Sequence, residues 1–465
     1  MVAKAALMVN PEAMLDSDVA APAGSAKTTL RIAACAALSY FLVYFIRYPV
    51  FMLPDEVALR PFATIFGKEV TLQEALTLAF CMGLGLAKLP AVRVMSSGVF
   101  FRNRFAFMVG LNVLACAALG LPLALTKGEP VATFVGVFIS CFPQSWVYCG
   151  VVTYLEGRRC TEMLFAALTF CFIFGGSASR GAATAVLSAG MPPHLMPLAI
   201  CGALLPPLIF LFWVLDRSPP PSAEDVAMRR PRRAMTAQER QAFLRSYWPG
   251  IVLLVCGYIL LSALRNARDL FNRDLITAAN GGSAPSPLVF TFIDMPGAVI
   301  AAVAQMAFVR VRENRRALVG MVLAIVLFLL AMIAATAAFR AGFLGGITWQ
   351  VILGVGMFGS FSMMSGSPVY DRLVSSSDCT GATCTFLIFM SDGMGYLSTM
   401  CLVLWKTFMP GGQSPGLLLN EFLQVLLPLT AAMVACYVAV VFYFLRRFWA
   451  SVPEPRQTFL ADECH

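Results

Sequence analysis

Long apolar segments recur along nearly the whole chain, and they restrict it to the folds that can cross a lipid bilayer. Hydrophobic residues make up 59% of the 465 positions and charged residues only 13%, whereas a soluble domain has about 25% charged residues. A transmembrane helix needs about 20 apolar residues, and the segments lack the short alternating pattern of barrel strands. We therefore expect an all-α membrane protein with twelve transmembrane helices, near residues 31–51, 73–95, 105–126, 131–154, 163–189, 195–215, 249–267, 287–309, 317–338, 345–365, 381–405 and 420–445.

A basic central loop divides the expected spans into two sets of six. The loop contains the run from Arg229 to Arg233, and its last part, Thr236 to Tyr247, is predicted to form an amphipathic helix on the membrane surface. Two sets of six spans around such a loop are typical of the parallel pseudo-repeats of the major facilitator superfamily. The expected domains are a disordered cytoplasmic tail at 1–29, an N-terminal six-helix bundle at 30–215, a cytoplasmic central loop at 216–248, a C-terminal six-helix bundle at 249–447 and a cytoplasmic tail at 448–465.

Cationic residues gather on one side of the expected spans. Most of the 34 Lys and Arg residues lie in the central loop and in clusters that end at Arg104, Arg159, Arg316 and Arg447. Because cytoplasmic loops are enriched in these residues, both termini are predicted to be cytoplasmic. The formal charge of +9 then reflects topology and contact with membrane lipids. It does not indicate a nucleic-acid partner, since no basic patch accompanies a soluble binding module.

Two arginines lie at matching places in the two sets of spans. Tyr40 precedes Arg47 by seven residues in the first span, and Tyr258 precedes Arg265 by seven residues in the seventh. A charged side chain inside a membrane helix costs about 2.5–3.5 kcal/mol on insertion scales. We interpret the two arginines as a central anion site near mid-depth, because guanidinium groups bind carboxylate and phosphate oxygens in pairs. The alternative is that each arginine pairs with Asp294 or Asp392, or extends to the membrane interface.

Further polar residues within the expected spans are candidates for the same site. Lys88 is either a substrate contact or a side chain that extends toward the cytoplasm, and Arg180 is either a site residue or part of a tightly packed segment. Asp294 and Asp392 are either proton carriers or partners of buried arginines. Tyr44 shares a helix face with Tyr40 and with Arg47.

Two other sets of residues carry predictions about packing and position. Tyrosine hydroxyls are expected to line a polar cavity, from Tyr40, Tyr44, Tyr148, Tyr258 and Tyr396. Tyr154 and Tyr370 are expected instead in an aromatic belt at the membrane interface. Small residues let helix backbones approach closely. Close helix crossings are therefore predicted at Gly83, Gly85, Gly175 and Gly176.

Metal, cofactor and enzyme chemistry are not indicated. The 14 cysteines are spread singly and the chain has only 2 histidines, and Cys379 and Cys384 have no histidine near them in the sequence. No cofactor or metal is therefore expected. The sequence contains no nucleophile-and-base constellation and no phosphate-binding loop, so an enzyme is not expected. No segment resembles the charged rings or the carbonyl filter of a channel. The protein is expected to be a monomer.

Several segments resemble known transporter families. Tyr44 to Arg47, Gly85 to Lys88 and Tyr258 to Arg265 resemble the organophosphate–inorganic phosphate antiporters of the major facilitator superfamily. This resemblance implies that Arg47 and Arg265 bind a phosphate group and that Lys88 assists. The chain is also similar, over most of its length, to a family of transporter-like proteins defined as a domain of unknown function. That similarity lies at Ser39 to Phe51, Gly83 to Ser97, Tyr370 to Leu373 and Phe389 to Lys406.

The residues and the resemblance together predict a secondary active transporter. We expect it to move a small organic anion that carries a phosphate group. Transport is expected to occur by alternating access, as in an antiporter or a related carrier. Two alternatives stay open at this point. One is a non-transporting anion sensor that keeps the transporter fold, and the other is a proton-coupled transporter of a different small solute.

Overall fold

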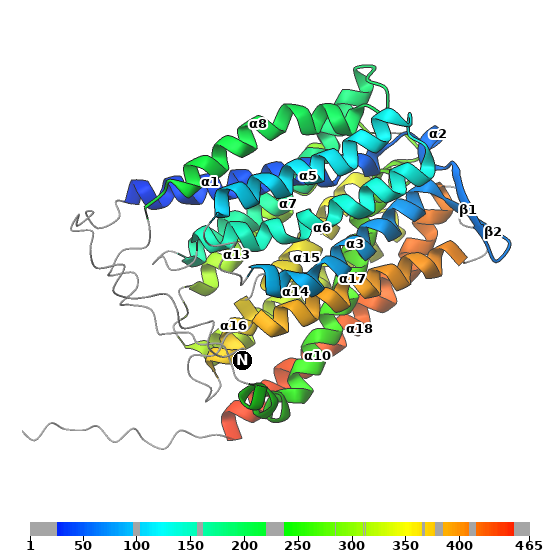
Figure 1. The fold of residues 1–465 in the computed structure, drawn as a ribbon. Helices are drawn as coiled ribbons and strands as arrows, with labels where there is room; N and C mark the ends of the chain where they lie inside the picture. Colours follow the sequence, from blue (N-terminus) through cyan, green and yellow to red (C-terminus); the bar gives the residue numbers. More distant parts are fainter. Residues whose placement is uncertain are drawn as a thin grey trace, which may run out of the picture.

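The computed structural model describes residues 26–95, 103–155, 161–219, 237–283, 285–309, 311, 313–364, 368–376, 385–408 and 415–450. Nearly all of these residues are helical (Figure 1). The first half, residues 26–219, contains α1 (Ala26–Arg47), η2 (Pro49–Met52), α2 (Asp55–Ala58), β1 (Pro61–Ile65), β2 (Lys68–Thr71), α3 (Leu72–Met95), α5 (Arg104–Leu125), α6 (Pro130–Leu155), α7 (Thr161–Ser188) and α8 (Met196–Asp216). The second half, residues 237–450, contains α10 (Ala237–Leu270), α11 (Asn272–Ala279), α12 (Pro287–Phe292), α13 (Met295–Val309), α14 (Asn314–Arg340), α15 (Gly346–Met364), α16 (Pro368–Ser375), α17 (Thr385–Phe408) and α18 (Pro415–Ala450).

A helix occupies each of the twelve ranges expected from the sequence. Ten helices or helix pairs among the described residues are long and apolar enough to cross a membrane, which confirms an integral, multi-pass membrane protein. The ten do not include α3 and α17, so twelve membrane spans stay a prediction. The segment near Thr236 to Tyr247 is not a separate surface helix, because α10 runs without a break from Ala237 to Leu270.

The expected eighth span is divided into two helices near Asp294. Helix α12 ends at Phe292 and α13 begins at Met295, with Ile293 and Asp294 in a turn between them. Pro296 favours this break because it has no N–H to donate to the preceding turn and it restricts the residue before it. The break places the fully buried carboxylate of Asp294 between two helices.

A two-stranded hairpin between α2 and α3 was not predicted from the sequence. Strands β1 and β2 are antiparallel, with Ile65 opposite Lys68. The two turn residues, Phe66 and Gly67, have φ of 50° and 79°. Positive φ at both turn positions matches the twist of the strands. The hairpin marks one end of the molecule, at the right of Figure 1.

The helices of the two halves pack in the same pattern. In the first half α1 packs on α6, α7 and α8, α3 packs on α6, and α5 packs on α6 and α8. In the second half α10 packs on α15, α17 and α18, α13 packs on α15, and α14 packs on α15 and α18. Each pairing therefore has a counterpart, with α1 equivalent to α10 and α6 equivalent to α15. The halves meet through α7 with α12 and α13, and through α3 with α17, and these two contacts are also equivalent.

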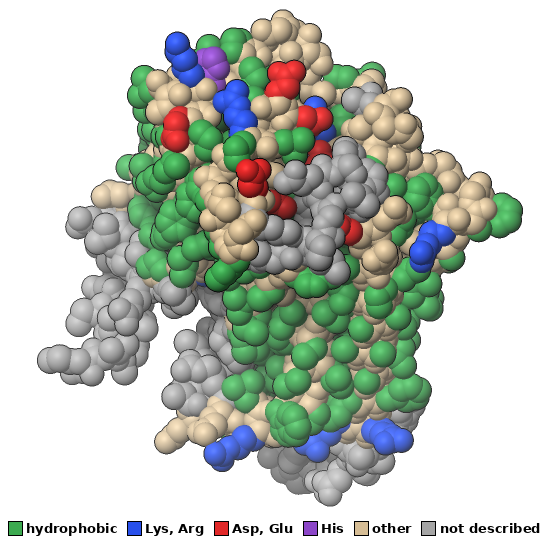
Figure 2. Space-filling view, turned by 90° about the vertical axis from the view of Figure 1, so that its right-hand side faces the viewer, with side chains coloured by type: hydrophobic (Ala, Val, Ile, Leu, Met, Phe, Trp, Pro, Cys, Tyr) green, Lys and Arg blue, Asp and Glu red, His purple; other side chains and the backbone are tan. Residues whose placement is uncertain are grey.

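The two ends of the molecule differ in charge. Helix α1 begins and α18 ends on the side opposite the hairpin (Figure 1). Figure 2 views the hairpin end, where acidic side chains lie among basic ones and a histidine, whereas only basic side chains appear along the lower edge, beyond a band of hydrophobic ones. Exposed acids of the hairpin end include Asp55, Glu56, Glu69 and Glu129. The basic end is the end that the sequence predicts to face the cytoplasm. Both terminal tails lie outside the described residues.

Only two of the four selected glycines lie at close helix crossings. A Cβ on Gly83 would lie 2.7 Å from Phe138 O on α6, and one on Gly175 would lie 3.1 Å from Phe41 O on α1. By contrast, a Cβ on Gly85 would lie 3.6 Å from Tyr396 Cβ, and one on Gly176 would lie 3.8 Å from the Tyr44 ring. At Gly85 and Gly176 a Cβ would make only ordinary van der Waals contact, so the close backbone approach predicted there is not found.

Candidate functional site

Eight charged side chains are buried or half-buried between the two halves, and they form the candidate site. Five are cationic and three are carboxylates: Arg47, Lys88, Arg180, Arg265 and Arg268, with Asp269, Asp294 and Asp392. Arg47 is the last residue of α1. Arg265 lies five residues before the end of α10, about 7.5 Å along a helix. Arg47 nevertheless bonds to Gln144, near the middle of α6, and the mid-depth position of the two arginines stays a prediction.

Arg47 is held by a glutamine and not by a carboxylate. Its Nε donates to Gln144 Oε1 and its Nη2 donates to the backbone oxygen of Gln144, both at 3.1 Å. The guanidinium also lies over the Tyr44 ring, 5.1 Å from the centroid. Among the described residues no carboxylate lies within ion-pair distance of Arg47. The alternative that Arg47 pairs with Asp294 or Asp392 is therefore wrong.

Arg268 repeats these contacts in the second half. Its Nε donates to Gln350 Oε1 and its Nη2 donates to the backbone oxygen of Gln350, again both at 3.1 Å. Arg47 and Gln144 lie on α1 and α6, and Arg268 and Gln350 lie on the equivalent helices α10 and α15. Arg268 is therefore held in the same way as Arg47, although Gln144 lies near the middle of α6 and Gln350 lies in the first turns of α15. The correspondence of Arg47 with Arg265 stays a prediction.

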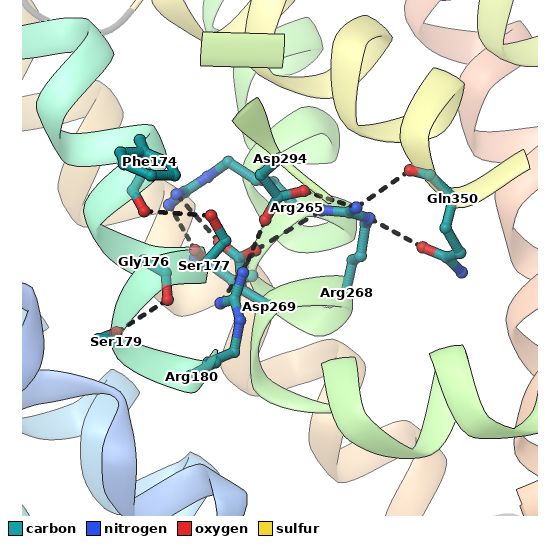
Figure 3. Close-up of polar contacts among 11 residues, drawn as sticks. Phe174, Gly176, Ser177, Ser179, Arg180, Arg265, Arg268, Asp269, Asp294 and Gln350 are labelled. Carbon is teal, nitrogen blue, oxygen red and sulfur yellow. Dashed lines mark hydrogen bonds and ion pairs between the residues drawn. The ribbon is translucent and has the colours of Figure 1, made fainter. Parts of the chain in front are cut away.

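Asp294 joins the two halves through two arginines (Figure 3). Arg180 Nη2 on α7 donates to Asp294 Oδ2 at 2.7 Å, and Arg268 Nη2 donates to Asp294 Oδ1 at 2.8 Å. Asp269 lies beside them, 3.8 Å from Arg180 Nη1 and 3.9 Å from Arg268 Nη1. All of these side chains are at most 5% exposed. Asp294 and Arg180 thus have the ion-pair role that the sequence left open.

The positive charge of Arg265 is less well neutralised by carboxylates than that of Arg268. Its Nη1 lies 3.4 Å from Asp269 Oδ2, and its Nη2 donates to Asn266 Oδ1 at 2.5 Å. The Nε of Arg265 is buried and has no hydrogen-bond partner among the described residues. The guanidinium lies over the Phe361 ring, 4.0 Å from the centroid. Arg265 therefore shares one carboxylate with two other arginines and retains an unused donor.

Lys88 and Asp392 form a second ion pair between the halves. The Lys88 ammonium on α3 contacts Asp392 Oδ2 on α17, and Tyr258 Oη donates to Asp392 Oδ1 at 2.5 Å. The two charged side chains are 15% and 31% exposed, so they are more accessible than the Asp294 cluster. Lys88 does not extend toward the cytoplasm, and Asp392 is the partner of a lysine rather than of an arginine.

Tyrosines connect these charged groups. Tyr40 and Tyr44 are buried on α1 with their rings 5.4 Å apart. Tyr396 on α17 lies 5.0 Å from the Lys88 ammonium, measured to the ring centroid. Arg47 and Arg265 also interact electrostatically with Tyr396. Lys88, Asp392, Arg47 and Arg265 therefore lie near Tyr396, while Tyr44 lies beside Arg47 and Tyr258 bonds to Asp392.

Other residues were misjudged or missed from the sequence. Tyr154 and Tyr370 do not form an interfacial belt. They are 6% and 1% exposed, and their hydroxyls bond to Asp216 and Ser391. Gln144 and Gln350 were not selected from the sequence as site candidates. An amide side chain buried in an apolar span needs a hydrogen-bond partner, and this signal could have indicated them. Cys379 and Cys384 lie outside the described residues.

The charges of the site do not balance. Five cations face three carboxylates, which leaves a surplus of two positive charges among these eight side chains. An unpaired buried charge is costly, and Arg47 has only neutral partners. The arrangement can therefore take up an anion between groups supplied by both halves.

Solved structures of transporters have a similar fold. An auto-inhibited POT family peptide transporter gives a TM-score of 0.58 at 12% identity, over 90% of this chain and 97% of that chain. A bacterial homologue of the human lysosomal transporter Spinster, in an inward-facing and unoccupied conformation, gives 0.55 at 12% identity, over 93% and 100%. The human organic anion transporter MFSD10 gives 0.55 at 13% identity, over 89% and 99%.

At these identities the likeness shows the fold alone. The fold and the buried charges define a multi-pass membrane protein with the fold of major facilitator-like transporters. The chain belongs to the family described as "Family of unknown function (DUF5690)", which matches residues 60–447. This confirms the predicted likeness to a domain-of-unknown-function family, and the matched range holds every charged site residue except Arg47. No curated protein sequence matches the chain. The resemblance to the organophosphate–phosphate antiporters is not shown by these comparisons and stays a prediction.

Proposed function

We propose that this protein is a secondary active transporter that moves a small organic anion, phosphate-bearing, across a membrane by alternating access. In this proposal twelve helices span the membrane in two six-helix bundles, with both termini in the cytoplasm. The single observation that carries the choice of an anion is the surplus of two buried positive charges. A phosphate monoester carries about two negative charges at neutral pH, which would neutralise that surplus.

The positions of the cations support movement by alternating access. Arg47 and Lys88 belong to the first half, whereas Arg265 belongs to the second. An anion bound between them would attract both halves and would change the balance of their contacts, as a ligand must if it is to shift a conformational equilibrium. The equivalent packing of the two halves supports a movement of one half against the other.

The contacts at the hairpin end support a closed state on that side. Gln73 Nε2 on α3 donates to Asp274 Oδ2 on α11 at 3.0 Å. Arg273 contacts both the backbone oxygen of Leu53 and, at 3.4 Å, the carboxylate of Asp55. These contacts join the first half to the second beyond the Asp294 cluster. We propose that substrate reaches the site from the opposite, cytoplasmic side in this state.

Uptake by proteoliposomes that contain the purified full-length chain tests the proposed function. The internal and external anions are varied among inorganic phosphate, phenyl phosphate and benzoate, with benzyl alcohol as an uncharged compound of similar shape. We expect saturable uptake of a phosphate-bearing anion that is accelerated by anion on the opposite side. Protein-free liposomes measure the background.

Two other results would replace the proposal. Binding of an anion without any flux would identify the non-transporting sensor. Uptake driven by a proton gradient and unaffected by anion on the opposite side would identify a proton-coupled carrier, for which the half-exposed Asp392 is the candidate group.

A further inference from the structure

Gln144 and Gln350 each hold one arginine through the same two contacts, yet the two arginines differ in charge balance. Gln144 and Gln350 each accept from the Nε and Nη2 of one arginine, and all four distances are 3.1 Å. In the second half the carboxylate of Asp294 completes the environment of Arg268, at 2.8 Å from Nη2. In the first half no described carboxylate takes this place beside Arg47.

The glutamine contacts leave a defined set of donors free. A guanidinium has five N–H donors in a fixed fork, and each glutamine occupies one on Nε and one on Nη2. The remaining donors of Arg47 lie on Nη1 and Nη2. On Arg268 the carboxylate oxygen of Asp294 is bound through the same Nη2. The contact of Asp294 therefore shows, within this protein, how an oxyanion approaches an arginine held by a glutamine.

We propose that Gln144 is a positioning residue, which holds Arg47 with neutral acceptors so that Nη1 and Nη2 bind an oxyanion of the substrate. In this arrangement Asp294 occupies on Arg268 the place that the substrate occupies on Arg47. The substrate class is a carboxylate or phosphate that presents two oxygens to a planar fork. This inference rests on the proposed function and adds which face of Arg47 binds and which residue fixes that face.

The neutrality of Gln144 is the property that matters. An amide holds the guanidinium and leaves its charge uncompensated, whereas a carboxylate at the same position would neutralise it. Gln144→Glu keeps the size and the acceptor of residue 144 and adds one negative charge beside Arg47. Gln350→Glu makes the identical change in the second half, where Arg268 already has Asp294 as its partner, and it is the matched control.

The experiment measures phenyl phosphate binding to the detergent-solubilised full-length chain by calorimetric titration. We expect Gln144→Glu to weaken binding by tenfold or more and Gln350→Glu to change it by less than about threefold. Gln144→Met, which removes the acceptor but adds no charge, is expected to weaken binding by about threefold to tenfold. Thermal unfolding without ligand is measured alongside. Gln144→Glu should raise the unfolding temperature by neutralising Arg47, and Gln350→Glu should lower it by placing a third carboxylate beside Asp269 and Asp294.

The outcomes separate this inference from the proposed function. Equal losses of affinity in the two glutamate variants, or unchanged affinity in Gln144→Glu, would overturn the inference while leaving the transporter proposal in place. A wild-type chain that binds neither inorganic phosphate, phenyl phosphate nor benzoate would contradict the proposed function. In that case opposite shifts of the two ligand-free unfolding temperatures would still support the position of Gln144, and shifts of the same sign would overturn it.

Discussion

Arg180 Nη2 donates to Asp294 Oδ2 across 2.7 Å, and this pair links α7 of the first half to the α12–α13 break of the second. Its structural counterpart is the pair of Lys88 on α3 with Asp392 on α17, because α7 is equivalent to α17 and α3 to the α12–α13 segment. Equivalent helices therefore carry opposite signs, since the first half supplies both cations and the second half supplies both carboxylates. The halves attract each other at two places.

Asp294→Asn should strongly destabilise the protein. The substitution leaves Arg180 and Arg268 without their shared carboxylate in a site that is fully buried. Removing one partner of a buried ion pair lowers the free energy of unfolding by about 3–5 kcal/mol. The loss is measured as a lower unfolding temperature and a lower yield of folded protein. Asp55→Asn is the control. It removes a carboxylate that also pairs with an arginine of the other half, but whose side chain is 61% exposed, so its cost is about 0–1 kcal/mol. Equal effects of the two substitutions would contradict the account of the cluster.

Lys88→Met and Asp392→Asn should each reduce stability, and the double variant should recover much of it. Each single change removes the ion-pair partner of the remaining charge, whereas the double change removes both charges. Transport by the double variant then separates two roles of Lys88. We expect transport to stay impaired although the protein is folded, because the lysine also faces Tyr396 and the arginine site. Full transport by the double variant would show that the pair is only structural.

Gly83→Ala should destabilise the contact of α3 with α6. The new Cβ would lie 2.7 Å from both Cys141 Cβ and Phe138 O, and neither atom is the far end of a flexible side chain. Overpacking of this kind costs about 1–3 kcal/mol. Gly202→Ala on α8 is the control, since nothing lies within 4 Å of its Cβ, and alanine there is expected to be neutral or to stabilise by about 0.5–1 kcal/mol. The unfolding temperatures of the two variants are compared, and an unchanged value for Gly83→Ala would refute the predicted close crossing.

The positions of the helices could be predicted from the sequence because apolar length alone determines them. The break at Asp294 could also have been expected from Pro296, two residues later. By contrast, the hairpin at Phe66 and Gly67 left little trace in the sequence, since both turn residues adopt positive φ without the usual asparagine or aspartate.

The site was only partly predictable. Buried charges mark it in the sequence, since each is costly in a membrane, and Arg47, Lys88 and Arg265 do lie around it. Their partners were not predictable, because a pairing between distant helices is a tertiary property. Arg265 and Arg268 are three residues apart and thus neighbours on one helix face. Only the contact with Gln350 shows that Arg268 is held in the same way as Arg47.

The central claim is that Arg47 and Arg265 together bind the substrate anion. It is tested most directly by calorimetric titration of the wild-type, Arg47→Ala and Arg265→Ala chains with phenyl phosphate. Charge-assisted hydrogen bonds contribute about 1.5–3 kcal/mol each, so each alanine variant should bind tenfold more weakly or worse. Arg→Lys should restore binding only in part, because lysine keeps the charge but lacks the planar fork. Arg340→Ala, at an exposed end of α14, should bind like the wild type. Wild-type affinity in either Arg47→Ala or Arg265→Ala would contradict the anion site.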